Sequence, residues 1–320
     1  MNFTAIDNLP SLTIGFLSIT VILSALTSLI RTQAFQPGTE WEDVIVPMLQ
    51  VVPSSVFYYP WTLWTATFVE TSPLQFILAL VIITFGITWL ENYWNFETRQ
   101  ESILPETFKF VSIITILTNF ISVLTVIIVH LIIPEALSDA DGVALFHPLR
   151  YGIYNLILPL SVVAKQLSPE VNLKLYSLKF RLKRLPIIML SFSAIISLLC
   201  GTLWPLIPAW NSMFFAWVYL RYWQVLPSET ILPGGNSTII TGDSSSLFDF
   251  VTFFPEAIQP KLKNSFDKIY DLSILLGLIR AWNEEDLERA PRSEQLKPTD
   301  GVTADERRKM IALKVLEEEN

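Results

Sequence analysis

Long apolar stretches occupy most of the first two thirds of the chain. Three of them cover residues 11–30, 73–90 and 108–133; the first contains no charged side chain, and His130 lies near the end of the third. A helix rises 1.5 Å per residue, so about 20 apolar residues are needed to cross the hydrocarbon core of a bilayer. Each of these stretches therefore predicts a membrane-spanning helix.

Three further apolar stretches follow. Residues 151–166 contain Pro159 and Lys165, residues 186–204 carry no charge, and residues 209–223 form the shortest stretch. We predict that they complete a bundle of six spans. The predicted fold class is an all-α, polytopic membrane protein with a six-helix transmembrane bundle.

The character of the chain changes after residue 223. We predict a transmembrane domain over residues 1–223 and a cytosolic tail over residues 224–320. Within the tail, residues 247–282 are apolar but interrupted by lysines and aspartates. They predict an amphipathic segment that packs on the membrane face or on a partner, and residues 305–319 predict a short helix.

The orientation follows from a cluster of basic residues after the fourth apolar stretch. Cytosolic loops are enriched in lysine and arginine, so we place this loop in the cytosol. Six spans then place both termini in the cytosol, where the sequons at Asn2 and Asn236 would not be glycosylated. The cluster consists of Lys174, Lys179, Arg181, Lys183 and Arg184.

The loop between the first two spans carries regularly spaced aromatic residues. Phe57, Trp61, Trp64 and Phe68 are four, three and four residues apart, which places them on one face of a helix. Tryptophan and tyrosine favour the bilayer interface. The spacing predicts a helix over residues 56–70 that lies in the lumenal interface.

Composition and charge exclude several classes of protein. Half of the residues (51%) are hydrophobic and only 16% are charged, which argues against an ordinary soluble enzyme and against disorder. The net charge is −8, and most of the acidic excess lies in the tail, so we expect no nucleic-acid partner. One cysteine and two histidines leave little material for a disulfide framework or a zinc site, and we predict no cofactor and no metal.

A short region resembles the rhomboid intramembrane proteases. Pro60-Trp61, then Thr65, then an apolar span ending at Glu91 match the rhomboid arrangement of an aromatic motif before helix two and an acid at its far end. The resemblance implies a rhomboid-like bundle.

The residues that rhomboid catalysis requires do not accompany this resemblance. Rhomboids use a G-x-S serine in helix four, and the corresponding helix here begins Tyr151-Gly152-Ile153. No histidine follows His147, so helix six supplies no base, and the helix-two pair falls at Gln75 and Ala79. A membrane serine protease needs nucleophile, base and oxyanion donors. We therefore predict a pseudoprotease without enzymatic activity and without catalytic residues.

Islands along nearly the whole chain resemble the transmembrane protein 115 family, rhomboid-like Golgi proteins that lack the protease residues. Asn95 departs from the glycine that the family favours. The resemblance implies Golgi residence, a role in retrograde Golgi-to-endoplasmic-reticulum transport, and contact of the tail with the conserved oligomeric Golgi tethering complex. The carrying positions, with structural or partner-binding roles, are Pro60, Trp61, Thr65, Glu70, Glu91, Trp94, Glu97, Lys165, Gln166, Trp217, Tyr219 and Arg221.

Four polar residues near the ends of the spans have competing interpretations. Lys165 is expected to snorkel to the headgroups or to form a helix-end ion pair, with a functional contact as the alternative. Arg221 is expected to be an interfacial anchor, or else to pair with an acid of helix two or with the tail. Glu70 is expected to be solvated, or to fix the first loop against the second span. We expect His130 to be held by a backbone partner.

The resulting hypothesis is a scaffold of Golgi membranes. Its bundle is expected to contact lipid and to bind transmembrane segments of client proteins, and its tail is expected to recruit peripheral machinery. Ser212 and Ala216, four residues apart, would allow close helix packing. The alternatives are a transporter and a lipid-modifying enzyme; the spans are sparse in charge and show no internal repeat.

Overall fold

The chain folds into two compact units in the computed structural model. Unit 1 comprises Met1–Val162 and Pro186–Asp243, and unit 2 comprises Val163–Leu185 and Ser244–Asn320. This division differs from the predicted boundary at residue 223, because a segment of the middle of the chain groups with the C-terminal part. The structure describes residues 9–35, 44–95, 104–132, 146, 148–149, 152–167, 171–175, 178–200, 205–226, 240–245, 248–255, 258–277 and 279.

Unit 1 is helical, with one short ladder in which β3 (Val225–Leu226) pairs with β4 (Ile240–Thr241). Two helices, α6 and α7, cross the division between the units. The described helices and helical turns that lie wholly or partly in unit 1 are α1 (Ser11–Ala34), α2 (Thr62–Thr65), η3 (Ala66–Phe68), α3 (Pro73–Val81), η4 (Ile82–Ile87), α4 (Thr88–Asn95), α5 (Glu106–Ile132), η6 (Ile153–Leu156), α6 (Ile157–Leu167), α7 (Leu185–Cys200), α8 (Leu206–Val218) and η8 (Tyr219–Trp223).

Helices occur at all six sequence stretches predicted to span the membrane. Among the described residues, four helical segments are long and apolar enough to cross a bilayer: Ser11–Ala34, Pro73–Trp94, Glu106–Ile132 and Leu182–Leu199. The helix α6 is shorter. The predicted fold class, an all-α membrane protein, is confirmed, while the count of six spans stays a prediction.

The polarity of α1 is the reverse of that of a helix in a soluble protein. Its buried face carries Thr13, Thr20 and Thr27, whereas Ile22 and Leu29 are 63% and 60% exposed. Water would drive those apolar side chains inward. A helix surrounded by lipid has no such drive, and small polar residues pack between helices instead. The reversal is independent evidence that α1 lies in a bilayer.

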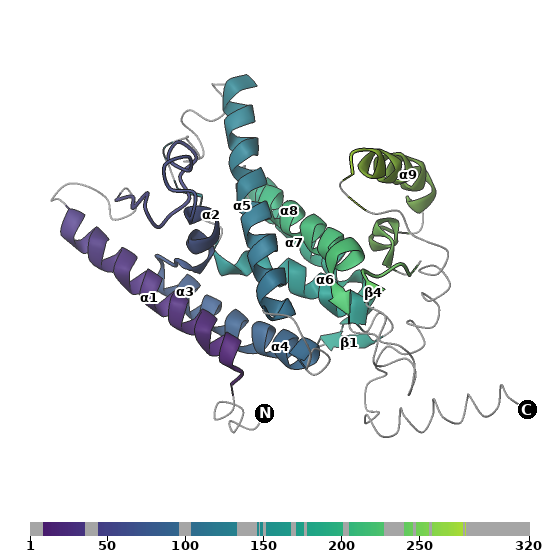
Figure 1. Ribbon diagram of the computed structural model, residues 1–320, viewed down its shortest axis with the longest axis horizontal. Helices are drawn as coiled ribbons and strands as arrows, with labels where there is room; N and C mark the ends of the chain where they lie inside the picture. The colour runs from purple at the N-terminus through teal and green to yellow at the C-terminus, as the bar shows by residue number, and fades with distance from the viewer. Residues whose placement is uncertain are drawn as a thin grey trace, which may run out of the picture. The chain divides into compact units, whose positions relative to one another are not determined.

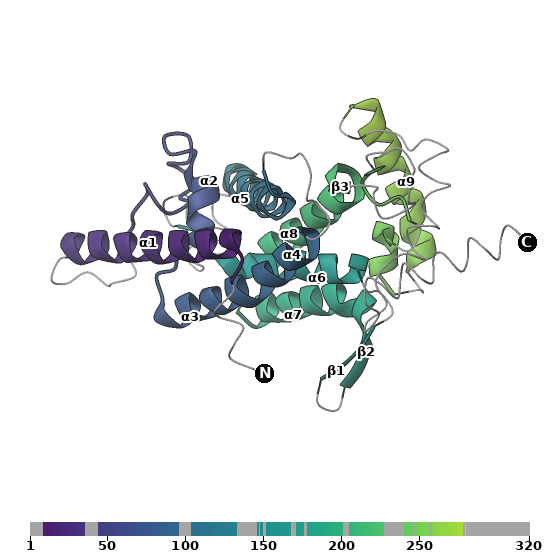
Figure 2. The ribbon, with the colours of Figure 1, turned by 60° about the horizontal axis from the view of Figure 1, so that its bottom comes forward.

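The helices of unit 1 pack around α5. The segment α3–η4–α4 is continuous and runs beside α1, while α5 packs between the α2 segment and α8 (Figures 1 and 2). The central part of this segment, η4, is a π-helix that contains Gly86. A Cβ at Gly86 would lie 2.5 Å from Cδ1 of Leu160, so a larger residue there would force the end of the Leu160 side chain in α6 to move.

The first loop does not form the predicted single helix over residues 56–70. Turns occupy residues 53–58, and only α2 and η3 follow. Pro60 lacks the N–H that a continuous helix requires at its position. The predicted aromatic face is also wrong, because Phe57 is 83% exposed whereas Phe68 is fully buried. Phe68 stacks on Phe16 of α1, with ring centroids 5.4 Å apart.

The described part of unit 2 combines the end of α6 with a hairpin and two tail helices. The strands β1 (Asn172–Leu175) and β2 (Leu178–Arg181) are antiparallel, and η7 (Leu182–Arg184) leads into α7. The predicted amphipathic segment 247–282 contains two helices, η11 (Phe250–Phe253) and α9 (Gln259–Leu275). The predicted helix over 305–319 lies outside the described residues.

Candidate functional site

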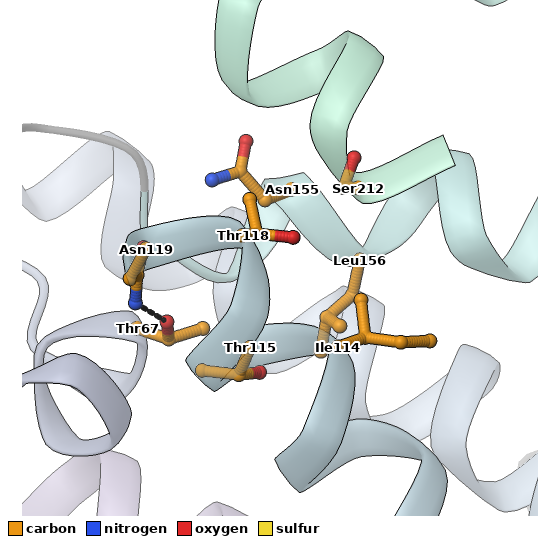
Figure 3. A pocket seen from close by; sticks show the side chains of 8 residues that line it. All are labelled: Thr67, Ile114, Thr115, Thr118, Asn119, Asn155, Leu156 and Ser212. Atoms are coloured by element: carbon orange, nitrogen blue, oxygen red, sulfur yellow. Dashed lines mark hydrogen bonds between the residues drawn. The ribbon is translucent and has the colours of Figure 1, made fainter. Parts of the chain in front are cut away.

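A small pocket lies inside unit 1, where α5 meets η3, η6 and α8. Its empty volume is about 190 Å³, open solvent at the mouth included. Six of its eight lining side chains are hydroxyls or amides, which is unusual inside an apolar helical bundle. The lining residues, all shown in Figure 3, are Thr67, Ile114, Thr115, Thr118, Asn119, Asn155, Leu156 and Ser212.

Asn119 joins the wall of the pocket to the first loop. Its Nδ2 donates to the carbonyl oxygen of Leu63 at 2.7 Å and to Oγ1 of Thr67 at 3.0 Å, the bond drawn in Figure 3. Leu63 lies in α2 and Thr67 lies in η3. The buried amide of Asn119 therefore fixes the end of the first loop to α5. On the opposite wall, Oγ of Ser212 donates to the carbonyl of Ala209 within α8 at 3.0 Å.

Two other hydroxyls of the pocket have no such partner. The Oγ1 atoms of Thr115 and Thr118 are buried and make no hydrogen bond among the described residues. Leaving a buried polar group unsatisfied costs about 1–3 kcal/mol. Figure 3 shows the Thr118 hydroxyl on the side of the pocket where Ser212 and Asn155 lie. The pocket therefore contains unused hydrogen-bonding capacity.

The chemistry of this lining is hydrogen bonding between neutral groups. A serine or threonine becomes a nucleophile when a neighbouring base accepts its proton. The eight lining residues include no histidine, lysine or carboxylate. The enclosed space is about that of one water molecule, so the arrangement suits a single small hydrogen-bonding group.

The sequence contained a signal for this site that the charge-based analysis did not use. Thr115, Thr118, Asn119 and Ser122 are three, one and three residues apart, so they share one face of α5. Asn211 of α8 donates to Oγ of Ser122 at 3.3 Å. Counting hydroxyls and amides as well as charges would have shown that polar groups converge in the bundle, which the sequence analysis did not find.

Glu91, one of the predicted family positions, binds the N-terminus of α1. One carboxylate oxygen accepts the backbone N–H of Leu12 at 3.1 Å, and the other accepts the N–H and the hydroxyl of Thr13, both at 2.9 Å. The first N–H groups of a helix have no intrahelical partner. Glu91 satisfies two of them and places negative charge at the positive end of the helix dipole.

Glu70 is buried rather than solvated, so the first of its two predicted interpretations is wrong. Its Oε1 accepts the backbone N–H of Ile153 at 3.1 Å, and its own N–H donates to Oγ of Ser24 at 3.0 Å. Burial raises the pKa of its carboxyl to about 7, against the opposing effect of the Ile153 hydrogen bond. The residue fixes the first loop to α1 and to the start of η6, not to the second span.

Gly152 makes this arrangement possible. Its φ is +49°, a conformation that other residues adopt at a cost. A Cβ at this position would collide with the Glu70 carboxyl, lying 2.9 Å from its Cδ. Gly152 thus leaves the space that the buried acid occupies.

The aromatic motif of the first loop holds the loop together. Nε1 of Trp61 donates to the carbonyl of Met48 at 3.0 Å, and Oγ1 of Thr65 donates to the carbonyl of Trp61 at 3.2 Å. Pro60 precedes this turn, and its carbonyl accepts the N–H of Leu63 at 3.2 Å. These family positions therefore stabilise the loop against itself.

Two further family positions, Trp94 and Tyr219, contact the same residue of α5. The rings of Trp94 and Tyr219 both contact Phe110 edge-on, with centroid distances of 5.1 Å and 5.5 Å. The Tyr219 hydroxyl also donates to the carboxylate of Glu106, the first residue of α5. Trp217 lies apart from this cluster, with its ring 5.8 Å from that of Tyr222.

Lys165 does not snorkel, because it is buried within unit 2. Its Nζ donates to Oγ1 of Thr252 at 2.7 Å and lies 3.3 Å from the ring centroid of Phe253. A desolvated cation over an aromatic ring is a favourable contact. The lysine thereby attaches the end of α6 to η11.

The remaining predicted positions are less informative. Gln166 and Arg221 are buried, and the carbonyl of Arg221 accepts the N–H of Asp243 at 3.1 Å. Burial of the Arg221 side chain argues against an anchor exposed to headgroups, and its pairing with an acid of helix two or with the tail stays a prediction. The expected backbone partner is absent at Nδ1 of His130, which makes no hydrogen bond within the described part of the chain. Glu97 lies outside the described residues.

Comparison with known proteins identifies the family. The family model described as a eukaryotic integral membrane protein (DUF1751) matches residues 14–319. The chain belongs to this family. It is 27% identical to the transmembrane protein 115 homolog of Saccharomyces cerevisiae, over 99% of this chain and 94% of that protein. It is also 29% identical to rhomboid-like protein 19 of Arabidopsis thaliana, over 67% of this chain and 62% of that protein.

These similarities confirm the resemblance found in the sequence. DUF1751 proteins are integral membrane proteins, and the apolar helices of unit 1 show that this member crosses the membrane several times. No solved structure matches the chain.

Proposed function

We propose that this protein is a catalytically inert, rhomboid-like scaffold of Golgi membranes. In this hypothesis the bundle binds transmembrane segments of client proteins, and the C-terminal region recruits the conserved oligomeric Golgi tethering complex for retrograde transport to the endoplasmic reticulum. The assignment to the Golgi rests on the resemblance to the transmembrane protein 115 family. Similarity to a transmembrane protein 115 homolog over nearly the full length supports it.

One observation carries the client-binding part of the proposal: two unsatisfied hydroxyls in an uncharged pocket. Thr115 and Thr118 present hydroxyls that nothing described in the chain satisfies. A polar side chain in a client helix faces the same problem in lipid, where no water is available. Hydrogen bonds between the two would satisfy both partners at once, each worth about 1–2 kcal/mol at most.

The test separates client binding from folding. Thr→Val substitutions remove a hydroxyl while nearly keeping the volume, so Thr115→Val/Thr118→Val removes two unsatisfied groups and should leave thermal stability equal or higher. We expect recovery of cross-linked transmembrane clients to fall at least fivefold. Ser191→Ala is a matched control, because that hydroxyl lies on the exposed face of α7 and bonds its own helix. Unchanged client recovery in the double variant would disprove this part of the proposal.

The recruitment part is tested by two truncations, one after Asp243 and one after Gly277. The second keeps α9 and the Lys165 contacts intact, so it isolates the segment beyond them. Recovery of tethering-complex subunits after cross-linking in membranes should fall in at least one truncation, while client recovery persists. If neither truncation lowers recovery of the subunits, the tail does not recruit the complex.

A transporter is the second candidate, favoured by the convergence of polar side chains on α5. It requires the pocket to open to water on each side of the membrane in turn. Thr118→Cys in a Cys200→Ser background can be treated with a membrane-impermeant thiol reagent from either side. Labelling from both sides would favour transport, and labelling from one side or neither favours the scaffold.

A further inference from the structure

The helix α9 has one wide apolar side, of which only one part is packed. Leu262, Phe266 and Tyr270 follow each other at intervals of four and are partly buried. The ring of Phe266 lies 4.8 Å from that of Phe250 in η11. This face is therefore occupied by the unit's own aromatic residues.

The adjoining part of this apolar side is open. Ile258, Ile269, Leu272 and Leu276 are separated by eleven, three and four residues, which places them on one side of the helix. They are 45–62% exposed, and we call them the α9 stripe. Leaving four large aliphatic side chains in water forfeits the free energy of burying them, so the α9 stripe calls for a covering surface.

The charges around the α9 stripe indicate what covers it. Lys261 and Lys268 lie three or four residues from its members and so border it, and both are exposed. Asp267 and Asp271 fall on the other side of the helix, together with one exposed lysine, Lys263. An apolar face bordered by lysines, with the acids opposite, matches an anionic lipid surface.

Chain continuity places unit 2 at such a surface. The first segment of unit 2 ends at Leu185. The candidate membrane span Leu182–Leu199 begins three residues before that point, so the segment leads directly into the membrane. The same segment carries the basic residues Lys174, Lys179, Arg181, Lys183 and Arg184. Basic residues next to a span are attracted to anionic headgroups.

We propose that α9 docks on an anionic bilayer, with the α9 stripe inserted at the boundary of headgroups and acyl chains. The helix then lies along the membrane, and η11 and the end of α6 are held beside it through Phe250 and Lys165. This inference uses the integral membrane character of the chain and does not depend on the scaffold proposal.

The experiment places a polarity-sensitive fluorophore on each side of α9 in the full-length protein. In a Cys200→Ser background, Ile269→Cys lies on the α9 stripe, and exposed Asn264→Cys lies on the far side as a matched control. Each labelled protein is reconstituted in vesicles of phosphatidylcholine alone or with 30% phosphatidylserine, with a spin-labelled lipid as quencher. With phosphatidylserine, we expect quenching at Ile269→Cys to be at least threefold stronger than at Asn264→Cys.

Added charge substitutions test the electrostatic contribution. Lys261→Glu/Lys268→Glu should reduce quenching at Ile269→Cys at least twofold in phosphatidylserine vesicles and have less effect in phosphatidylcholine alone. Equal quenching at the two labelled positions would overturn the proposal. It would also be overturned if Ile269→Cys became shielded only when cytosolic protein is added, because the α9 stripe would then be a protein-binding surface.

Discussion

Glu91→Gln tests the interaction between the second helical segment and the start of α1. In the native protein, three hydrogen bonds of 2.9–3.1 Å reach the two carboxylate oxygens. The substitution changes one oxygen into an NH₂ group, which cannot accept the N–H that it then faces. It also removes the negative charge from the helix N-terminus.

The expected loss follows from these two effects. A hydrogen bond to a charged group contributes about 1.5–3 kcal/mol, and the charge–dipole interaction contributes about 0.3–1 kcal/mol. We therefore expect Glu91→Gln to lower the free energy of unfolding by about 2–4 kcal/mol. At roughly 2 °C per kcal/mol for a large domain, the melting temperature should fall by about 4–8 °C.

The assay is thermal unfolding of the purified protein in detergent, followed by the loss of monodisperse material. Asp271→Asn is the matched control, because it removes an exposed acid of α9 and should shift the melting temperature by less than about 1 °C. Thr13→Val removes the hydroxyl that donates to Glu91 at 2.9 Å and accepts the Thr88 hydroxyl at 3.4 Å, and should cost about 1–2 kcal/mol. Because the two residues share an interaction, their effects should not be additive. If Glu91→Gln and Asp271→Asn have the same melting temperature, the capping role of Glu91 is refuted.

Three further predictions concern buried groups. The pKa of Glu70 is raised from 4.5 to about 7, so the folded state binds a proton more tightly than the unfolded state. The free energy of unfolding should therefore fall by about 3 kcal/mol as the pH rises from 4.5 through 7. Glu70→Gln should abolish this dependence, which melting curves at pH 5 and 7.5 would show. If the native protein and the variant respond to pH in the same way, the carboxyl does not have the raised pKa. Gly152→Ala should lower the free energy of unfolding by at least about 1–2 kcal/mol, which is the cost of placing a residue with a Cβ in a left-handed conformation. Displacement of the Glu70 side chain should add to this cost. A melting temperature equal to that of the native protein would disprove the tight contact. Lys165→Met keeps an apolar side chain but loses the cation and its Thr252 bond, so limited proteolysis should cleave near η11 several-fold faster, and an unchanged rate would argue against that attachment.

The sequence located the helices but not the shape of the first loop. Apolar length alone marks a span, since a bilayer requires about 20 residues. The aromatic spacing of the first loop suggested one continuous helix, but Pro60 and the burial of Phe68 against Phe16 override it. Local periodicity does not report which aromatic ring will find a partner on a distant helix.

The candidate site was predictable only in part. The family positions were found as a set, yet their contacts required the fold: Glu91 lies 78 residues from Thr13 in sequence, and Glu70 lies 83 residues from Ile153. Lys165 was expected to reach the headgroups because of its place at a helix end, and only the return of the tail at Thr252 and Phe253 makes it a buried contact. Charge alone does not indicate the pocket, because its polar lining consists of threonine, serine and asparagine.

The sequence by itself determined that this protein is a helical membrane protein, because each span must carry its own apolar length and satisfy its own backbone hydrogen bonds, whatever its neighbours are. Tertiary structure alone decided where the polar side chains of those spans are used. Partners far apart in the chain come together only when helices pack, and the packing leaves Thr115 and Thr118 beside an open space instead of beside an acceptor.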